Sequence, residues 1–333
     1  MTTDTLPRLP RCAYFATGGT IAMKADPDTG AAVPALSGED LLGTVPEMAS
    51  IARLDVRNPF NLPSPYMGPS RWVMLRESVA AALAHDDVAG VIVSHGTDTL
   101  EETAWFLDLT IDSSKPVVMI GAQRNGSWRD FDGPRNLLNA ARVCVSPDAR
   151  DKGVLVVLNN QINAAREVTK THTFDVESFK SGDFGFLGTV DDDRVTFARA
   201  ALRRQFIALS THDLSYVEIV PMYGGADGGL VRAAVALGAK GIVIQALGSG
   251  NVNAGMFDAI RDAMAAGVVI VISTRVPNGR VRPTYGFAGG GSTLKAAGAV
   301  FADNLSPQKA RILLMLVMQT TTNPGQIQSL FDR

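Results

Sequence analysis

The stretch Val91-Ile92-Val93-Ser94-His95-Gly96-Thr97-Asp98-Thr99-Leu100-Glu101-Glu102 decides the fold of this 333-residue chain. It opens on a β-branched run, which is typical of a buried strand. A helical pattern follows, because Leu100, Ala104 and Leu107 recur on one face. The turn at Thr97-Asp98 therefore joins the carboxyl end of a strand to the amino end of a helix. Ligands of α/β sheets bind at that position, and the helix dipole there favours anions.

Asp98 also has a purely structural interpretation. The pattern Asp98-x-x-Glu101 fits a capping box, in which Asp98 would accept a hydrogen bond from a helix N–H. On its own the stretch favours this role, since caps outnumber catalytic sites among such motifs. The choice between cap and functional carboxylate therefore depends on the rest of the chain.

A second strand-to-turn stretch runs from Tyr14 to Ala22 and contains Thr17-Gly18-Gly19-Thr20. Its two glycines let another backbone or a ligand approach closely, and they place Thr20 just past the strand end. The stretch holds neither Gly-x-Gly-x-x-Gly nor Gly-Lys-Ser/Thr, so nucleotide binding at Gly18-Gly19 is disfavoured.

Taken together, Thr17-Gly18-Gly19-Thr20-Ile21-Ala22 and His95-Gly96-Thr97-Asp98-Thr99 resemble the two signatures of the bacterial-type L-asparaginases, in the asparaginase/glutaminase family. Further blocks that resemble the family extend almost to the C-terminus: Lys115–Ala122, Asp132–Leu137, Val168–Lys170, Ser273–Arg275 and Pro307–Arg311. We therefore expect a full-length relative of this family.

The resemblance implies hydrolysis of the side-chain amide of L-asparagine through an acyl-threonine intermediate, with release of ammonia and then L-aspartate. By motif matching, Thr20 is the nucleophile, and Thr97 with Lys170 forms a second catalytic set beside Asp98. A threonine hydroxyl is a poor nucleophile and needs a base. Lys170, if partly desolvated beside Thr97, could lose its proton and serve that role.

The resemblance also assigns the substrate contacts. Asp98 and Ser64 would hold the amine and the carboxylate of the substrate, and Ala122 would offer its backbone carbonyl. Backbone N–H groups near Gly19 and Thr97 would hold the oxyanion. Such paired anchors suit a small amino-acid amide, because they make attack on the amide carbon effectively intramolecular.

An assembly is implied as well. Asn251 matches the polar residue that a neighbouring chain contributes in the family, which implies a homodimer or homotetramer with sites near the intimate dimer interface. The loop Pro277–Arg280 stands where many secreted relatives carry a neighbour-chain glutamate, and Pro65 replaces the glutamine that usually follows the carboxylate-binding serine.

The segment Met23 to Ser37, rich in Ala, Gly, Pro and Asp, is predicted to be a mobile loop that closes over substrate, with a plain connection as the alternative. The family normally places a tyrosine in this loop, whereas Ala31 occupies the aligned position and residues 21–40 hold no tyrosine. This departure leaves open a catalytically weak aspartate- or asparagine-binding sensor. A glutaminase or another amino-acid amidase also stays open, because one methylene changes transition-state binding by only about 1–3 kcal/mol.

Strand and helix patterns alternate along the chain, which predicts an α/β fold with two domains. We expect a larger N-terminal parallel-sheet domain of flavodoxin/Rossmann-like type over 1–200, a linker over 201–215, and a smaller C-terminal α/β domain over 216–333. The last helix is expected over Ala310 to Met318.

Bulk properties narrow the functional class. The net charge of −2 provides no basic face for nucleic acid or an anionic membrane. Met1 to Pro10 holds no apolar run, so we expect neither a signal peptide nor a membrane anchor, and a cytoplasmic location. Cys12 and Cys144 are expected to be buried thiols rather than a disulfide. The histidines show no ligand spacing, so no metal or other cofactor is expected, and His95 is interpreted as a strand-end residue that orders its turn.

Overall fold

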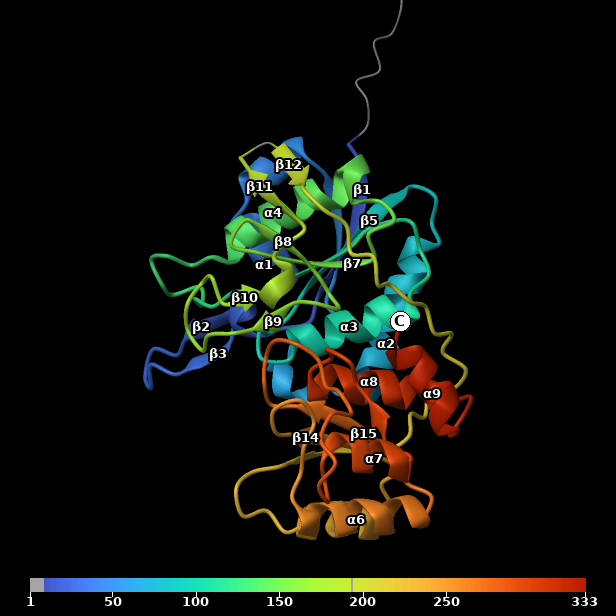
Figure 1. The fold of residues 1–333 in the computed structure, drawn as a ribbon. Helices are drawn as coiled ribbons and strands as arrows, with labels where there is room; N and C mark the ends of the chain where they lie inside the picture. Colours follow the sequence, from blue (N-terminus) through green and yellow to red (C-terminus); the bar gives the residue numbers. More distant parts are fainter. Residues whose placement is uncertain (1–8, 193) are drawn as a thin grey trace, which may run out of the picture. The chain divides into compact units, whose positions relative to one another are not determined.

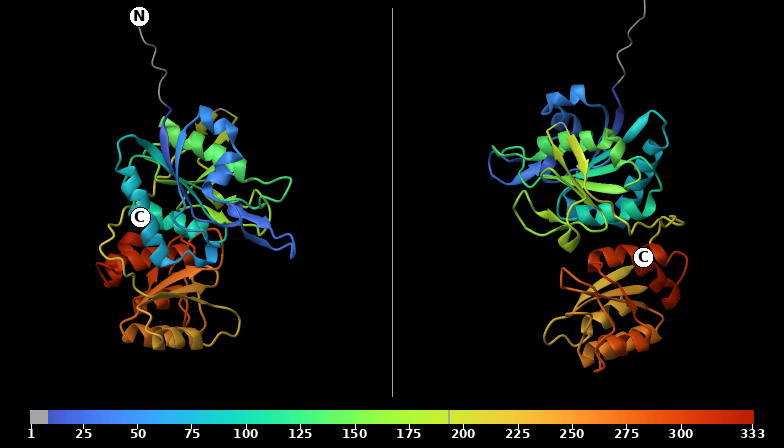
Figure 2. Two further views of the ribbon diagram at one scale, coloured as in Figure 1. Left: turned by 180° about the vertical axis from the view of Figure 1, so that it is seen from behind. Right: turned by 45° about the horizontal axis from the view of Figure 1, so that its top comes forward.

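The computed structural model describes residues 9–192 and 194–333. The segment Met1 to Pro10, in which no signal peptide is expected, lies largely outside the described residues. The chain divides into two compact units, Met1–Phe206 and Ile207–Arg333, which are described here one at a time (Figures 1 and 2). The division falls inside the segment 201–215 that the sequence predicts as a linker.

The N-terminal unit is built on an eight-stranded sheet with the strand order β12-β11-β8-β7-β6-β5-β1-β4. Its parallel strands are β1 (Arg11–Ala16), β4 (Arg53–Arg57), β5 (Val88–Ser94), β6 (Val117–Ile120) and β7 (Val154–Leu158). Antiparallel pairing adds β8 (Gln161–Ala164), β11 (Gly188–Asp191) and β12 (Arg194–Phe197).

The sheet is therefore mixed, and the prediction of a parallel sheet is right only for its larger part. The reversal occurs at Asn159-Asn160, where φ is 47° and 63°. Two consecutive residues of positive φ form the tight turn that returns a strand antiparallel to the one before it, and Asn tolerates this conformation better than most residues.

Helices cover both faces of the sheet, as the alternating pattern predicts (Figure 1). Ile92, Val118 and Leu155 point to one face, where they form a core with α4 (Gly133–Val145) and the short α1 (Gly38–Gly43). The intervening residues of the same strands point to the opposite face, because side chains alternate along a strand. That opposite face is covered by α2 (Pro69–Leu83) and α3 (Leu100–Thr110).

Two small hairpins lie outside the main sheet. β2 (Met23–Ala25) pairs with β3 (Ala32–Pro34), so the prediction of a loop from Met23 to Ser37 is wrong for these two strands, while its closure over substrate stays a prediction. The Asp26 carboxylate accepts the backbone N–H of Thr29 at 2.8 Å, which closes the turn of the hairpin. The second hairpin joins β9 (Thr169–Lys170) to β10 (Phe179–Lys180). Short 3₁₀ helices complete the unit: η1 (Thr20–Ala22), η2 (Pro46–Ser50), η3 (Ser64–Tyr66), η4 (Pro147–Ala149) and η5 (Gly182–Phe184).

The C-terminal unit has a parallel four-stranded sheet in the order β13-β14-β15-β16. Its strands are β13 (Val217–Pro221), β14 (Gly241–Ala246), β15 (Val269–Thr274) and β16 (Val300–Phe301). Its helices are α5 (Gly229–Ala236), α6 (Ala254–Ala265), α7 (Gly291–Ala297), α8 (Pro307–Val317) and α9 (Pro324–Phe331). The sequence predicts α8 as the last helix, and α9 corrects this: Pro324 opens it and Asn323 caps it by accepting a hydrogen bond from Gln326 N.

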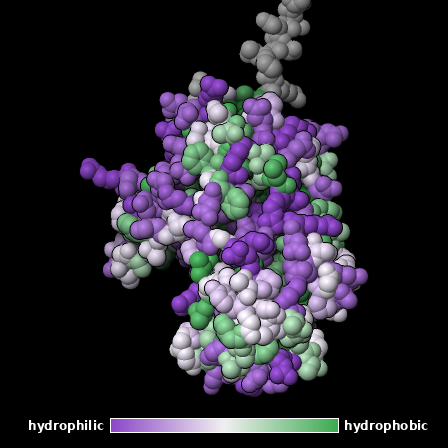
Figure 3. Space-filling model, in the orientation of Figure 1, coloured by the Kyte–Doolittle hydropathy of each residue, from purple (hydrophilic) through white to green (hydrophobic). Residues whose placement is uncertain are grey.

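Apolar side chains fill a separate core in each unit, and hydrophilic side chains predominate over much of the face drawn in Figure 3. Cys12 and Cys144 are buried free thiols in the first core, which confirms the prediction. Burial raises the pKa of the Cys144 thiol. Across the described parts of the chain, none of the helices has the length and apolar character needed to cross a bilayer.

Candidate active site

The two signature turns lie side by side because β1 and β5 are neighbours in the sheet. The strands run parallel with Ala16 opposite Ser94. Beyond β1, the backbone N and the hydroxyl Oγ1 of Thr17 both donate to the carbonyl oxygen of Ser94, at 3.0 and 2.8 Å. Parallel strands end at the same edge of a sheet, so both turns begin at the same edge.

The backbones of the two turns touch at their glycines. A Cβ atom on Gly19 would lie 2.1 Å from the Cα and 2.3 Å from the N of Gly96. Gly19 has φ 85° and ψ −176°, a conformation that is essentially restricted to glycine. Thr20, which is half-buried, and Thr97, which is buried, are the residues that follow these two glycines. The structure thus brings together two segments that are far apart in the sequence.

Ser64 joins this pair from a third segment. Leu62 N donates to the carbonyl of Thr17 at 3.1 Å, and Thr99 Oγ1 donates to the carbonyl of Ser64 at 2.7 Å. The Ser64 hydroxyl lies 2.9 Å from the point where a Cβ on Gly96 would stand, and Ser64 is only 3% exposed. A rigid, proline-flanked loop therefore presents a buried hydroxyl beside both signature turns.

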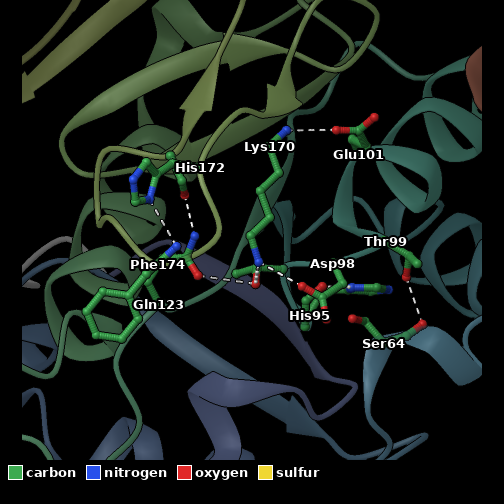
Figure 4. Close-up of polar contacts among 12 residues, drawn as sticks. Ser64, His95, Asp98, Thr99, Glu101, Gln123, Lys170, His172 and Phe174 are labelled. Atoms are coloured by element: carbon green, nitrogen blue, oxygen red, sulfur yellow. Dashed lines mark hydrogen bonds and ion pairs between the residues drawn. The ribbon is translucent and has the colours of Figure 1, made fainter. Parts of the chain in front are cut away.

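Lys170 reaches the same place from β9 (Figure 4). Its Nζ donates to Thr97 Oγ1 at 2.8 Å and forms an ion pair with Asp98 Oδ1 at 2.7 Å. The Lys170 side chain is 16% exposed, whereas that of Asp98 is 64% exposed. The amine is therefore largely enclosed, while the carboxylate stays open to a ligand.

Asp98 does not cap the helix, so the capping-box interpretation is wrong. α3 begins at Leu100 with Thr99 at the N-cap position and without a side-chain capping bond. Glu101, the other member of the proposed box, instead accepts hydrogen bonds from Lys170 N at 2.8 Å and from the Thr169 hydroxyl. The carboxylates of both residues contact the β9 segment, a partner that no local pattern reveals.

The end of β6 supplies a further side of the site. A Cβ on Gly121 would come within 2.9 Å of Thr97 Cγ2, and the next residue, Ala122, is fully buried. Gln123 then places its Oε1 3.5 Å from Thr97 Oγ1 and donates from Nε2 to the Ser178 hydroxyl. Gln123 is not among the residues predicted from the sequence, although its place after Ala122 at the carboxyl end of a central strand was a usable signal.

Asp132 fixes the turn that carries Gln123. Its carboxylate accepts Gln123 N at 3.1 Å and Arg124 N at 2.9 Å, and it also accepts Asn136 Nδ2 at 3.2 Å. Burial raises the pKa of the Asp132 carboxyl, although the hydrogen bonds from these donors partly oppose this change.

His95 is fully buried under the second signature turn. Its Nδ1 lies 2.7 Å from the carbonyl oxygen of Gly96, and its Nε2 lies 2.9 Å from the hydroxyl oxygen of Thr103. Burial lowers the pKa of His95 to about 4, so the ring is neutral near pH 7. These contacts tie strand, turn and helix together, as predicted for a histidine that orders the turn.

Asn251 belongs to the C-terminal unit, whereas the residues described above belong to the N-terminal unit. Its Oδ1 accepts Gly291 N at 3.2 Å, and its backbone forms a bridge with Leu247. Its contribution to a neighbouring chain stays a prediction. Within residues 9–192 and 194–333, no three His, Cys, Asp or Glu side chains gather as metal ligands.

The gathered groups have a clear chemical character. A partly exposed carboxylate and a buried serine hydroxyl can hold the two charged ends of an amino acid. The same sheet edge also carries two threonine residues and one enclosed amine, and such hydroxyl–amine pairs serve nucleophilic catalysis.

Comparison with known proteins finds relatives that match almost the whole length of the chain. Family models described as "Asparaginase, N-terminal" and "Glutaminase/Asparaginase C-terminal domain" match residues 11–203 and 216–331. L-asparaginase 2 of Bacillus subtilis is 39% identical, in an alignment covering 97% of this chain and 86% of the relative. Glutaminase-asparaginase of Pseudomonas fluorescens is 33% identical, with coverage of 98% and 91%. A crystal structure of "Probable Cytoplasmic L-asparaginase from Campylobacter jejuni" superposes with a TM-score of 0.88 at 35% identity, covering 97% of this chain and 99% of the other.

Proposed function

This chain belongs to the L-asparaginase family, and on that premise we propose that it hydrolyses the side-chain amide of L-asparagine to L-aspartate and ammonia. The single observation that supports this activity most strongly is the contact between Gly19 and Gly96, which sets the two signature threonines at one sheet edge. The hydrogen bond from Lys170 to Thr97 adds an amine to that group.

The proposed reaction has two steps. In the first, the Thr20 hydroxyl attacks the amide carbon and loses its proton, the C–N bond breaks, and the nitrogen leaves as ammonia after taking up a proton. In the second, water attacks the acyl-Thr20 ester, the ester C–O bond breaks, and L-aspartate is released while Thr20 regains its proton. Lys170, in its neutral form, is the proposed base for the proton that Thr97 relays, and this proton then passes to the leaving nitrogen in the first step and to Thr20 in the second.

The remaining residues are proposed to bind the substrate. Asp98, with its exposed carboxylate, would pair with the substrate ammonium, and the buried Ser64 hydroxyl would donate to the substrate carboxylate. The Ala122 carbonyl would accept from the ammonium or the amide. Backbone N–H groups near Gly19 and Thr97 would stabilise the oxyanion that forms as the nucleophile adds.

L-glutamine is a second candidate substrate. The relative from Pseudomonas fluorescens carries the name glutaminase-asparaginase, and Pro65 departs from the family's usual glutamine beside the carboxylate-binding serine. One additional methylene is worth only about 1–3 kcal/mol of discrimination, so both amides belong in the same assay.

The test is ammonia release from asparagine and from glutamine by the wild type and by Thr20→Ala. Loss of the nucleophile should lower kcat by roughly a thousandfold or more, as expected when covalent catalysis is removed. Thr196→Ala, on the edge strand β12, is the matched control and should leave kcat unchanged. Equal background release by the wild type and Thr20→Ala would rule out the proposed activity and favour a binding protein.

We further propose a homodimer or a homotetramer with sites near the intimate dimer interface, in which Asn251 of one chain completes the site of its neighbour. We propose a cytoplasmic location on the basis of the matching Campylobacter jejuni structure, whose description names it cytoplasmic. Sedimentation velocity tests the assembly, and fractionation of cells that express the full chain tests the location.

A further inference from the structure

We propose that Glu101 is a positioning residue for Lys170, holding the backbone of the lysine while Thr97 and Asp98 hold its amine. This inference rests on the proposed function, in which Lys170 serves Thr97. Glu101 is a buried carboxylate of α3, and it would support the reaction by positioning Lys170 rather than by contacting the substrate.

The contacts of Glu101 cross a long stretch of sequence. Its Oε2 accepts the backbone N–H of Lys170 at 2.8 Å and also the hydroxyl of Thr169, which is 68 residues away in the chain. Glu101 is 6% exposed, so its carboxylate is withdrawn from water. A buried carboxylate needs such donors, and hydrogen bonds to a charged group are among the stronger ones in proteins.

Lys170 is consequently held at both ends by one short segment. Thr97 and Asp98 contact its Nζ at 2.8 and 2.7 Å, and Glu101 contacts its backbone N (Figure 4). All three contacts come from the end of the signature turn and the first turn of α3. The same five-residue segment, Thr97 to Glu101, therefore holds both the backbone N and the amine of Lys170.

The need for this contact follows from where Lys170 sits. Among the strands that the structure describes, β9 pairs with β10 in a two-stranded sheet and is not part of the eight-stranded sheet. Arg124 donates to the carbonyl oxygen of Phe174 at 2.6 Å, at the tip of this hairpin. Gln123 donates to the hydroxyl of Ser178, just before β10. Glu101 holds the strand of the lysine itself. A displacement of about 1 Å can cost roughly a hundredfold in rate, which makes such a support valuable.

The test uses Glu101→Ala and Glu101→Gln, with Glu102→Gln as the matched control. Glu102 is the adjacent residue in the same first turn of α3, so its substitution reproduces the change in charge near the helix N-terminus. Glu101→Ala should lower kcat by roughly ten- to a hundredfold while KM for asparagine changes by less than about threefold. Glu101→Gln keeps an acceptor for Lys170 N and should recover most of kcat.

Hydrogen exchange provides a readout that does not depend on activity. The Lys170 amide donates directly to Glu101, so its exchange should be faster by at least about tenfold in Glu101→Ala and unchanged in Glu102→Gln. If Glu101→Ala fails to fold, the same comparison is made with Glu101→Gln, for which we expect a smaller acceleration.

The outcomes separate the two proposals. If the wild type releases no ammonia but the Lys170 amide exchanges faster in Glu101→Ala, the proposed function is wrong while Glu101 still positions the lysine. If the wild type is active and Glu101→Ala has the same kcat, the proposed role of Glu101 is wrong. A loss that appeared in KM alone, or equally in Glu102→Gln, would overturn it too.

Discussion

His95 couples the stability of the active-site turn to pH. Its pKa of about 4 in the folded state is below the value of 6.5 for the free side chain, because the buried ring is costly to charge. Between these values the unfolded chain binds a proton that the folded chain does not, so stability falls as pH falls through this window. The loss attributable to His95 is roughly 3 kcal/mol, at about 1.4 kcal/mol for each unit of pKa.

Urea unfolding at several pH values between 7.5 and 4 checks this expectation. His95→Gln should give a flatter dependence, while the exposed-histidine control His85→Gln should follow the wild type. Asp132, whose pKa is raised, acts in the opposite sense and favours the folded state at low pH, but it is common to all three proteins. Parallel curves for His95→Gln and the wild type would contradict the assignment.

The contact between the two signature turns can be tested at Gly19. Gly19→Ala would bring a methyl group within 2.1 Å of the Gly96 backbone, in addition to the strain of a positive φ. Gly30 also has a positive φ, 71°, but a methyl group there would meet nothing within 4 Å, which makes Gly30→Ala the matched control. We expect a loss of about 1 kcal/mol for Gly30→Ala and of about 3 kcal/mol or more for Gly19→Ala, with ammonia release abolished only in the latter.

Much of the residue-level arrangement could be predicted from the sequence, because it depends on local features. A pair of glycines after an apolar strand indicated a close approach, and the structure shows Gly96 as the partner. Gln123 and Glu101 escaped prediction as site neighbours because their contacts depend on where β6 and β9 lie in space. An acidic residue in the first turn of a helix can complete a capping box or bind a distant segment, as Glu101 does, and the sequence alone does not distinguish the two.

At the scale of elements, the turn between β6 and α4 depends on one carboxylate. Asp132 satisfies the backbone N–H groups of Gln123 and Arg124, so Asp132→Ala would leave these donors without their acceptor. We expect a loss of about 2 kcal/mol in the free energy of unfolding, together with a fall in kcat because Gln123 adjoins Thr97. Asp132→Asn retains an acceptor oxygen and should lose less.

Asp130→Ala is the control for this element, because Asp130 is in the same turn and pairs with Arg124 at 3.2 Å while being 63% exposed. Exposed ion pairs contribute little, so its effect should stay below about 1 kcal/mol. Urea unfolding of the three variants decides the matter, and equal losses for Asp130→Ala and Asp132→Ala would refute the role of Asp132.

Elements with strong periodicity were predictable, and those that depend on distant pairing were not. β5 and α3 follow the apolar run Val91–Val93 and the recurrence of Leu100, Ala104 and Leu107, which the sequence displays directly. β8, β11 and β12 are short and half polar, so no apolar pattern marks them in the sequence. Their antiparallel pairing follows from the turn at Asn159-Asn160, which reverses the direction of the chain after β7. β2 and β3 consist largely of exposed residues, and their pairing is set by a local turn rather than by burial.

At the scale of the whole molecule, the alternation of strands and helices predicted two α/β parts, and two compact units with separate cores are found. The number of chains in the assembly is a different kind of question, because it depends on surfaces that meet only between copies. The resemblance to the family supplies the hypothesis that Asn251 acts in a neighbouring chain, and this hypothesis has a direct genetic test.

Co-expression of Thr20→Ala and Asn251→Ala chains with different affinity tags, followed by purification through both tags, gives mixed assemblies. If Asn251 acts across the interface, an Asn251→Ala chain supplies Thr20 to a site that receives Asn251 from its Thr20→Ala neighbour. That site is intact, so the mixed assembly should release ammonia faster than either variant alone. If Asn251 acts within its own chain, every site lacks one of the two residues and no recovery occurs. The activity of doubly tagged assemblies, measured against equal amounts of each single variant, therefore decides whether neighbouring chains share a site.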